Sequence, residues 1–250
     1  MLEKETKPNL SIMKNTTLLF GLLFLVLTSC NNDDDMQTID TSNKNLVAYF
    51  PFNGNAIDQI NLENTSLVKG AILSTDNQGI DNSAFRFNGI DDIIEINHSA
   101  ALNLTNEFTI SALVNAEEIK SQTIIRKGAA VNGIGTVPYG LSMSATGAIS
   151  FTATTENGAT INHVSKQGYQ TNEWYLITGV LKDSEMFLYV NGVLEDSVII
   201  NGESNTNSFP LLIGSRLRLE SNTFKGVIDE VRLYNVALTE SEILALQNNL

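Results

Sequence analysis

The sequence predicts an all-β fold, a sandwich or a jelly roll of short strands, that ends in one short helix. The first observation comes from Trp174–Ile199, where three apolar runs are separated by two turns. The second of these turns is Asn191-Gly192, and both residue types tolerate the positive φ angles of a tight hairpin turn. The second observation is that most of residues 45–250 continues as short apolar runs between turn residues. This spacing is typical of a sandwich or a jelly roll.

The expected strands begin at Leu46 and are separated by loops rich in asparagine and glycine. Pro51 near the end of the first strand indicates a sheet edge or a bulge, because proline has no backbone N–H to donate. The expected strands outside Trp174–Ile199 are Leu46–Phe52, Ala84–Phe87, Ile93–Ile96, Glu107–Ala116, Gln122–Arg126, Tyr139–Ser144, Ala148–Thr154, Pro210–Ser215 and Phe224–Tyr234.

The strand Glu107–Ala116 alternates between apolar and polar residues, as a strand with one buried face does. Its apolar face is made by Phe108, Ile110, Ala112 and Val114, and its polar face by Thr109, Ser111 and Asn115.

The last strand contains a carboxylate where the pattern expects an apolar residue. By period two, Val227, Asp229, Val231 and Leu233 share one face. A carboxylate on an apolar face costs free energy unless it is paired or bound to a metal. Asp229 is therefore the first candidate site residue, either as a metal ligand or as an acceptor of backbone amides at the strand end.

One helix is expected at Glu240–Gln247. Thr239 can cap it, and Glu242 stands at the third position, as in a capping box. Leu238 and Ile243 are spaced as a hydrophobic staple. We expect this helix to lie across the end of the sandwich.

The composition limits the partners. The 250 residues are 42% hydrophobic and 17% charged, and the formal net charge is −13. Nucleic acid is excluded as an expected partner because binding it requires a basic face. Direct binding to anionic lipid headgroups is disfavoured for the same reason.

The N-terminus predicts export and lipidation. Leu18–Leu27 is an apolar run of a length that suits a signal peptide but not a membrane span. Leu27-Thr28-Ser29-Cys30 resembles the bacterial lipobox, and Cys30 is the only cysteine. We therefore expect residues 1–29 to be a lipoprotein signal peptide, with Met13 as an alternative start, and Cys30 to be lipidated.

Residues 30–44 are expected to form an acidic linker, because they lack an apolar period. The run Asp33-Asp34-Asp35 closely follows the expected lipidation site, and it resembles the surface-export signal of Bacteroidetes lipoproteins. We expect an exported lipoprotein of the outer membrane, displayed on the cell surface, with residues 45–250 as its single domain.

Five motifs occur in a fixed order along this domain. They are Phe87–Ile96 (FNGIDDIIEI), Phe108–Ala112 (FTISA), Trp174 with Leu188–Gly192 (LYVNG), Leu212–Ser215 (LIGS) and Gly226–Thr239 (GVIDEVRLYNVALT). They resemble motifs of LamG-like jelly-roll domains in the concanavalin A-like lectin/glucanase superfamily, although Leu113 stands where tryptophan is usual. The resemblance implies two antiparallel sheets and a family made mostly of binding and adhesion modules, many for glycans. Function does not follow from the fold alone.

The resemblance also implies a structural Ca²⁺. In related jelly rolls an aspartate of the last strand holds calcium together with loop oxygens near the first strand. The corresponding candidates are Asp229 with Asn53 or Asp58. Calcium needs six to eight oxygen ligands, and the sequence indicates only these few.

Enzymatic activity is not expected. Glycosidases of the superfamily carry two carboxylates on one strand, spaced ExDxxE, and this spacing does not occur in the sequence. Lyases of related fold need a Tyr/His pair, whereas His98 and His163 lie far apart and outside any recognisable motif. Catalytic residues are therefore expected to be absent.

Glycan binding usually needs exposed aromatic rings, and Tyr139, Tyr169 and Tyr175 are the candidates. Trp174 is expected in the core instead. We predict a non-catalytic binding module for extracellular polysaccharide or host glycan. The alternative is an adhesin or assembly subunit that binds a surface protein, and a divergent glycosidase or lyase is the remaining interpretation.

Overall fold

The computed structural model describes residues 45–128, 137–155, 160–164, 168–200, 204–216 and 222–250. The expected signal peptide, Cys30 and the acidic linker lie outside these residues. Within them the chain forms two antiparallel sheets and one C-terminal helix, so the predicted fold class is confirmed. No described helix has the length and apolar character that crossing a bilayer requires.

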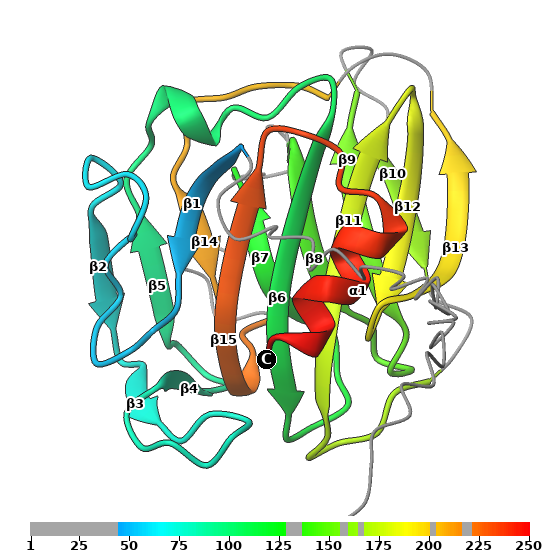
Figure 1. The fold of residues 1–250 in the computed structure, drawn as a ribbon. Helices are drawn as coiled ribbons and strands as arrows, with labels where there is room; N and C mark the ends of the chain where they lie inside the picture. The colour runs from blue at the N-terminus through cyan, green and yellow to red at the C-terminus, as the bar shows by residue number, and fades with distance from the viewer. Residues whose placement is uncertain (1–44, 129–136, 156–159, 165–167, 201–203, 217–221) are drawn as a thin grey trace, which may run out of the picture. The chain divides into compact units, whose positions relative to one another are not determined.

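The first sheet has eight strands in the described residues, in the order β13-β12-β11-β6-β15-β4-β3, with β1 also paired to β15 (Figure 1). Its strands are β1 (Leu46–Phe50), β3 (Ile72–Ser74), β4 (Ala84–Asn88), β6 (Phe108–Ala116), β11 (Trp174–Lys182), β12 (Glu185–Val190), β13 (Val193–Ile199) and β15 (Lys225–Tyr234).

The second sheet has seven strands in the described residues, in the order β10-β9-β8-β7-β14-β5-β2. Its strands are β2 (Ser66–Lys69), β5 (Ile93–Ile96), β7 (Gln122–Lys127), β8 (Tyr139–Met143), β9 (Ile149–Thr154), β10 (Thr160–Val164) and β14 (Leu211–Ile213). A short 3-10 helix, η1 (Ala100–Leu102), follows β5.

The main core lies between the sheets. The apolar face predicted for β6 is fully buried there, and it meets residues of the second sheet such as Phe151 and Tyr139. Thr109 and Ser111 of the polar face are also buried, which the alternation alone did not predict. Thr109 Oγ1 accepts a hydrogen bond from Leu238 N at 2.9 Å, and Ser111 Oγ bonds Thr178 Oγ1 at 3.0 Å. Polar side chains are buried here because each finds a partner.

A second apolar cluster lies on the outer face of the eight-stranded sheet, the face that carries Leu113 of β6. The C-terminal helix α1 (Glu240–Asn248) packs on this cluster. Ile243 and Leu246 of α1 pack with Leu113 of β6, Leu176 of β11 and Tyr189 of β12. The helix therefore lies on the outer face of the eight-stranded sheet, in front of β6 and β11 in Figure 1, and the expected position across the end of the sandwich is wrong. Its apolar stripe needs a flat apolar surface, which the outward side chains of the sheet provide.

The strand β15 contains a bulge that changes which residues face the core. Its pairing with β6 shifts between Asp229 and Arg232, where one extra residue is accommodated. Glu230 takes the left-handed conformation, with φ of 52°. As a result Ile228 and Val231 both lie in the core, and the predicted shared face of Val227, Asp229, Val231 and Leu233 is wrong. Asp229 sits at the bulge instead.

Candidate functional site

The bulge lies where β15 changes its neighbour. Residues Lys225–Ile228 pair with β4, and residues Val231–Tyr234 pair with β1 on the same edge. Asp229 and Glu230 fall between these two ladders. A cavity of about 120 Å³ opens at this point, and its lining includes Asn53, which follows β1, and Asp76, which follows β3.

Asp229 is the most buried acid of this cavity, with 3% of its surface exposed. Its Oδ1 accepts a hydrogen bond from the backbone N–H of Glu230 at 2.7 Å. Burial, followed by the nearby charge of Glu230, raises the pKa of Asp229 to about 8. Asp76 raises it further, while the backbone hydrogen bond and Arg232 act in the opposite direction. The carboxyl group is therefore held where its charge is poorly compensated by the protein.

The negative charge of Glu230, in contrast, is compensated by neighbouring side chains. The hydroxyl of Tyr49 donates to its Oε1 at 3.0 Å or its Oε2 at 2.9 Å, and Arg232 forms an ion pair with it. The guanidinium of Arg232 also lies 4.6 Å from the centre of the Tyr49 ring. Among the described residues, Nη1 of Arg232 has no hydrogen-bond partner. The network balances one carboxylate of the cavity and leaves Asp229 without its own cation.

The cavity suits an oxygen-ligated cation in the chemistry of its donors. Asn53, Asp76 and Asp229 bring an amide and two carboxylates to the lining of one cavity. No three acidic, histidine or cysteine side chains in the described part of the chain are arranged to hold a metal ion by themselves. A cation here would therefore depend on side-chain amide oxygens as well as on the carboxylates.

A larger hollow lies on the outer face of the same sheet, on β3, β4 and the start of β15. One part has a volume of about 330 Å³ and is lined by Gly70, Ile72, Arg86, Asn88, Asp92 and Lys225. A second part of about 390 Å³ shares Ile72 and Arg86 with the first and continues along the β3–β4 loop. We call the two parts the Arg86 groove.

The local sequence explains this groove. In β4, Phe85 and Phe87 point into the core, so Arg86 and Asn88 point outward. Ile72 of the edge strand β3 pairs with Arg86 and is 62% exposed. The groove thus combines an exposed apolar side chain with polar side chains, which is the composition of many ligand sites.

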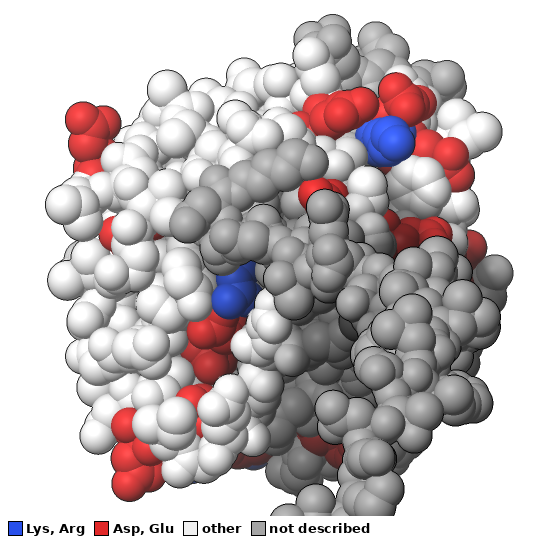
Figure 2. Space-filling model, viewed as in Figure 1, with Lys and Arg blue, Asp and Glu red and all other residues white. Residues whose placement is uncertain are grey.

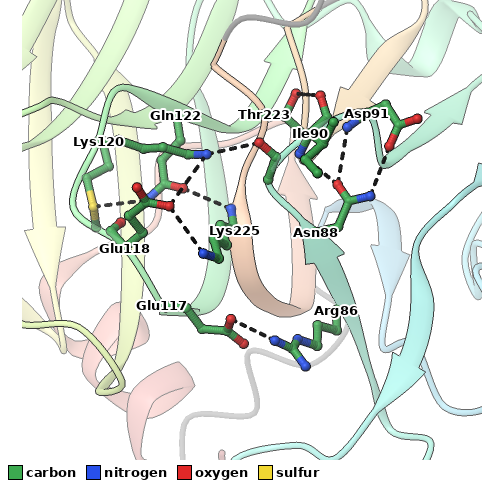
Figure 3. Close-up of polar contacts among 12 residues, drawn as sticks. Arg86, Asn88, Ile90, Asp91, Glu117, Glu118, Lys120, Gln122, Thr223 and Lys225 are labelled. Atoms are coloured by element: carbon green, nitrogen blue, oxygen red, sulfur yellow. Dashed lines mark hydrogen bonds and ion pairs between the residues drawn. The ribbon is translucent and has the colours of Figure 1, made fainter.

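Acidic residues hold the cations of the groove from outside it (Figure 3). Glu117 Oε2 accepts a hydrogen bond from Nη2 of Arg86 at 2.7 Å. Glu118 Oε2 lies 3.4 Å from Nζ of Lys225 and 3.9 Å from Nζ of Lys120. Both glutamates come from the loop after β6. They restrict the cationic side chains without lining the groove themselves.

The floor of the groove depends on a close contact. Asp92 is 4% exposed, and its Oδ2 accepts a hydrogen bond from the backbone N–H of Asn88 at 2.7 Å. Burial raises the pKa of Asp92, the bond from Asn88 lowers it, and Asp91 raises it again. Gly70 leaves the space that the Asp92 carboxylate occupies.

On the face viewed in Figure 2, acidic side chains are scattered over the described surface, with few lysine and arginine side chains among them. This agrees with the net charge of −13. The first part of the Arg86 groove, in contrast, is lined by both an arginine and a lysine.

The family model described as the concanavalin A-like lectin/glucanases superfamily matches residues 88–244. The chain belongs to this superfamily. A search of curated protein sequences found no match. The match covers β5 to most of α1, which includes both sides of the bulge and the start of β15.

Three solved structures of similar fold share 18–20% sequence identity with the chain. The binding domain of Paraclostridial Mosquitocidal Protein 1 has a TM-score of 0.67 at 20% identity, over 82% of this chain and 52% of that one. Domain 4 of the extracellular arabinanase AbnA from Geobacillus stearothermophilus, solved with arabinotriose, has a TM-score of 0.62 at 19% identity, over 81% and 98%.

The botulinum neurotoxin serotype D ligand binding domain, solved with N-acetylneuraminic acid, has a TM-score of 0.64 at 18% identity, over 82% and 51%. The chain therefore spans about half the length of the toxin domains and nearly all of the arabinanase domain.

The three tyrosines expected to contact a ligand do not form an exposed platform. Tyr139 is fully buried, and its hydroxyl donates to the carbonyl of Leu102, so its prediction as a ligand residue is wrong. Tyr169 is 8% exposed and packs edge-to-face on Tyr175 at 4.8 Å between ring centres. Tyr139 and Tyr169 belong to the main core, and Tyr175 is partly buried against it. Trp174 is partly buried against the second apolar cluster.

The predicted calcium ligands separate into two groups. Asn53 and Asp229 line the same cavity, which Asp58 does not. Oδ1 of Asp58 accepts hydrogen bonds from the backbone of Tyr49, Ile60 and Asn61, and its Oδ2 accepts one from Asn64. Both oxygens are occupied, so Asp58 closes a turn and does not fit as a ligand.

Sequence reasoning missed Asp76 and Arg86. Asp76 lies in a loop without a motif, and nothing local marks it. Arg86 did carry a signal, because the alternation of Phe85, Arg86, Phe87 and Asn88 places a cation on the outward face of a strand.

Proposed function

We propose that the protein is a non-catalytic glycan-binding module. The observation that carries this proposal is the Arg86 groove, in which an exposed Ile72 lies beside the polar side chains of Arg86, Asn88 and Lys225. Sugars present both apolar C–H faces and hydroxyl groups, so a site of this mixed character suits them. Because Tyr139 and Tyr169 are buried in the core, they do not offer their ring faces to a sugar, and this favours the groove as the binding site.

The relatives support the class of ligand. One similar structure was solved with arabinotriose and another with N-acetylneuraminic acid. Both are similar to this chain in fold, and each ligand belongs to its own protein. Polysaccharides outside the cell and host glycans are the proposed ligands here.

A glycan array followed by titration calorimetry tests the proposal on the purified protein. We expect at least one oligosaccharide to bind, and we expect Arg86→Ala to weaken that binding by about tenfold or more. Lys182→Ala is the matched control, because Lys182 is exposed at the end of β11, away from the groove. Binding that is equal in all three proteins would place the site elsewhere, and no binding to any glycan would refute the function.

We further propose a structural calcium ion at the cavity of Asp229, with Asn53 and Asp76 as partners. Bound calcium would compensate the charge of Asp229 and fasten the loops after β1 and β3 to β15. The support is the burial of Asp229 together with the oxygen donors that share its cavity.

The proposed setting is the surface of a bacterial cell, with a lipid anchor at Cys30. The support is the apolar run Leu18–Leu27, the lipobox-like sequence and the acidic residues after it. Mass spectrometry of the protein from its native membrane tests this. An N-terminal fragment that starts at Cys30 and carries acyl chains is expected, and an intact Met1 or an unmodified cysteine would contradict it.

Protein binding is the second candidate. It is favoured by exposed apolar side chains on the edge strand β13, namely Val193, Leu194 and Ile199. A β13 variant with all three changed to threonine would lose binding to a protein partner but keep glycan binding. If no protein partner binds the wild type, or if the variant binds it equally well, this second candidate loses its support.

A further inference from the structure

Two cations of the Arg86 groove lie on the same face of neighbouring strands. In the β4–β15 ladder Lys225 pairs with Asn88, and Arg86 pairs with Val227. Arg86 and Lys225 are thus diagonal neighbours, a relation that separates Cβ atoms by about 7 Å. Both side chains line the hollow of about 330 Å³. One small group in that hollow can therefore contact both.

Apart from Asp81, which lines the second part of the Arg86 groove, the acids near these cations lie outside its first part or beneath its surface. Glu117 and Glu118 pair with Arg86 and Lys225 but do not line the first part. The one acid that lines it is Asp92, which is 4% exposed and binds the backbone of Asn88. The hollow therefore presents two cations at its surface and keeps its single carboxylate beneath them.

The cations also retain donors for a ligand. The bond to Glu117 uses Nη2 of Arg86, and a guanidinium carries five N–H donors in a planar fork. Half of the Arg86 side chain and 41% of the Lys225 side chain are exposed. Figure 3 shows the two side chains directed to separate glutamates. Each glutamate occupies part of the donor capacity of its cation and leaves the remaining N–H groups to a ligand.

We propose that the groove selects acidic glycans, and that Arg86 and Lys225 bind the carboxylate of a uronic or sialic acid unit. This inference rests on the proposed glycan function and adds the class of sugar. The planar fork of Arg86 matches the two oxygens of a carboxylate, and Lys225 adds a point charge from the neighbouring strand. Ile72 contacts the apolar face of the same sugar ring.

The test compares oligogalacturonate with the neutral oligogalactoside of equal length obtained by reducing its carboxyl groups. Calorimetry on the purified protein is expected to give at least tenfold tighter binding of the acid. Raising NaCl from about 0.05 M to about 0.5 M is expected to weaken the binding of the acidic oligosaccharide and to leave the binding of the neutral one unchanged. A sialylated oligosaccharide and a sulfated galactan separate carboxylated sugars from sulfate esters.

Four variants assign the effect to the groove. Arg86→Gln and Lys225→Gln are each expected to remove most of the preference for the acid while leaving the melting temperature unchanged. Glu117→Gln removes a competing carboxylate and is expected to bind the acid as tightly or more tightly. Lys182→Gln, which changes the net charge equally, is expected to behave as the wild type. A loss of acid binding in Lys182→Gln would mean that only the overall charge matters.

The outcomes separate the inference from the function on which it rests. Equal binding of the acidic and neutral oligosaccharides overturns the inference and leaves the glycan module intact. Acid binding that persists in both Arg86→Gln and Lys225→Gln also overturns it. Preference for the sulfated galactan alone refutes the carboxylate assignment. If no glycan binds, the proposed function fails, and the inference fails with it.

Discussion

Oδ1 of Asp92 lies 2.0 Å from the point that a Cβ atom on Gly70 would occupy. Gly70 also has a φ of +79°, a conformation that side chains rarely adopt. The two residues together form the floor of the Arg86 groove, because the missing side chain of one admits the carboxylate of the other. The groove is therefore part of the packing of the sheet and not only a feature of its surface.

Gly70→Ala is expected to lower the free energy of unfolding by about 2–4 kcal/mol, since the new methyl group must displace a buried carboxylate. Gly79→Ala is the matched control, because its φ is +84° and a Cβ atom added there would have nothing within 4 Å. It should cost only the backbone strain, about 1 kcal/mol. Urea unfolding of both variants measures the difference. Equal losses would show that Asp92 can move at no cost.

Calcium is expected to raise the melting temperature of the wild type, since a ligand at about 100 times its Kd stabilises the folded state by roughly 2.7 kcal/mol. Asp229→Asn should abolish this shift, because it removes the buried ligand charge. Asp58→Asn should lose about 1–3 kcal/mol of stability through its broken turn and still respond to calcium. Calorimetric scans with calcium and with EGTA test this, and an unresponsive wild type would exclude the ion.

The buried ammonium of Lys127 predicts a dependence of stability on pH. Its Nζ donates to the backbone oxygens of Asn207 and Phe209 and lies 3.3 Å from Nδ1 of His98. Burial lowers its pKa from 10.5 to about 8. Between these values the unfolded chain binds more protons than the folded one, so stability should rise with pH.

The cost of this charge is fully present below pH 8 and is relieved by about pH 10.5, with an upper limit of roughly 3 kcal/mol. Lys127→Met should remove the rise of stability with pH. The difference in stability between the two proteins separates the effect of Lys127 from that of tyrosines that titrate in the same pH range. Urea unfolding at intervals from pH 7 to about pH 11 measures it. Parallel curves for the two proteins would contradict the assignment.

Thr239→Ala is expected to cost about 1 kcal/mol, because the hydroxyl caps the helix that covers β6 and β11. Thr239 Oγ1 accepts from the backbone of Glu242 at 3.3 Å, and the Glu242 side chain accepts a bond from the backbone N–H of Thr239 at 2.8 Å. Ser241→Ala, in the same turn, keeps the cap and should change stability by less than about 0.5 kcal/mol. Thermal unfolding distinguishes the two variants.

Features set by a few neighbouring residues could be predicted from the sequence. Asn191 and Gly192 both have positive φ, as the hairpin turn between β12 and β13 requires. The capping box of α1 is also present as expected. Both depend on local hydrogen bonds and backbone geometry, which short sequence patterns describe well.

Features that depend on strands far apart in the sequence could not be predicted in this way. A period-two count passes through Glu230 without interruption, whereas the structure has a bulge there, at the point where β15 leaves β4 and meets β1. The burial of Tyr139 between the sheets and the shared cavity of Asp76 and Asp229 depend on the same long-range packing. A tyrosine in a strand has the same local signature whether it faces the core or a ligand.

The two ends of β15 lie beside different parts of the domain. At one end Tyr234 pairs with Leu46, and Asn235 donates to the carbonyl of Asn45, so the polypeptide enters the domain there. At the other end Lys225 lines the groove. Ten residues of extended strand separate these points by about 30 Å. A ligand in the Arg86 groove would therefore lie about one strand length from Asn45, the first residue that the structure describes.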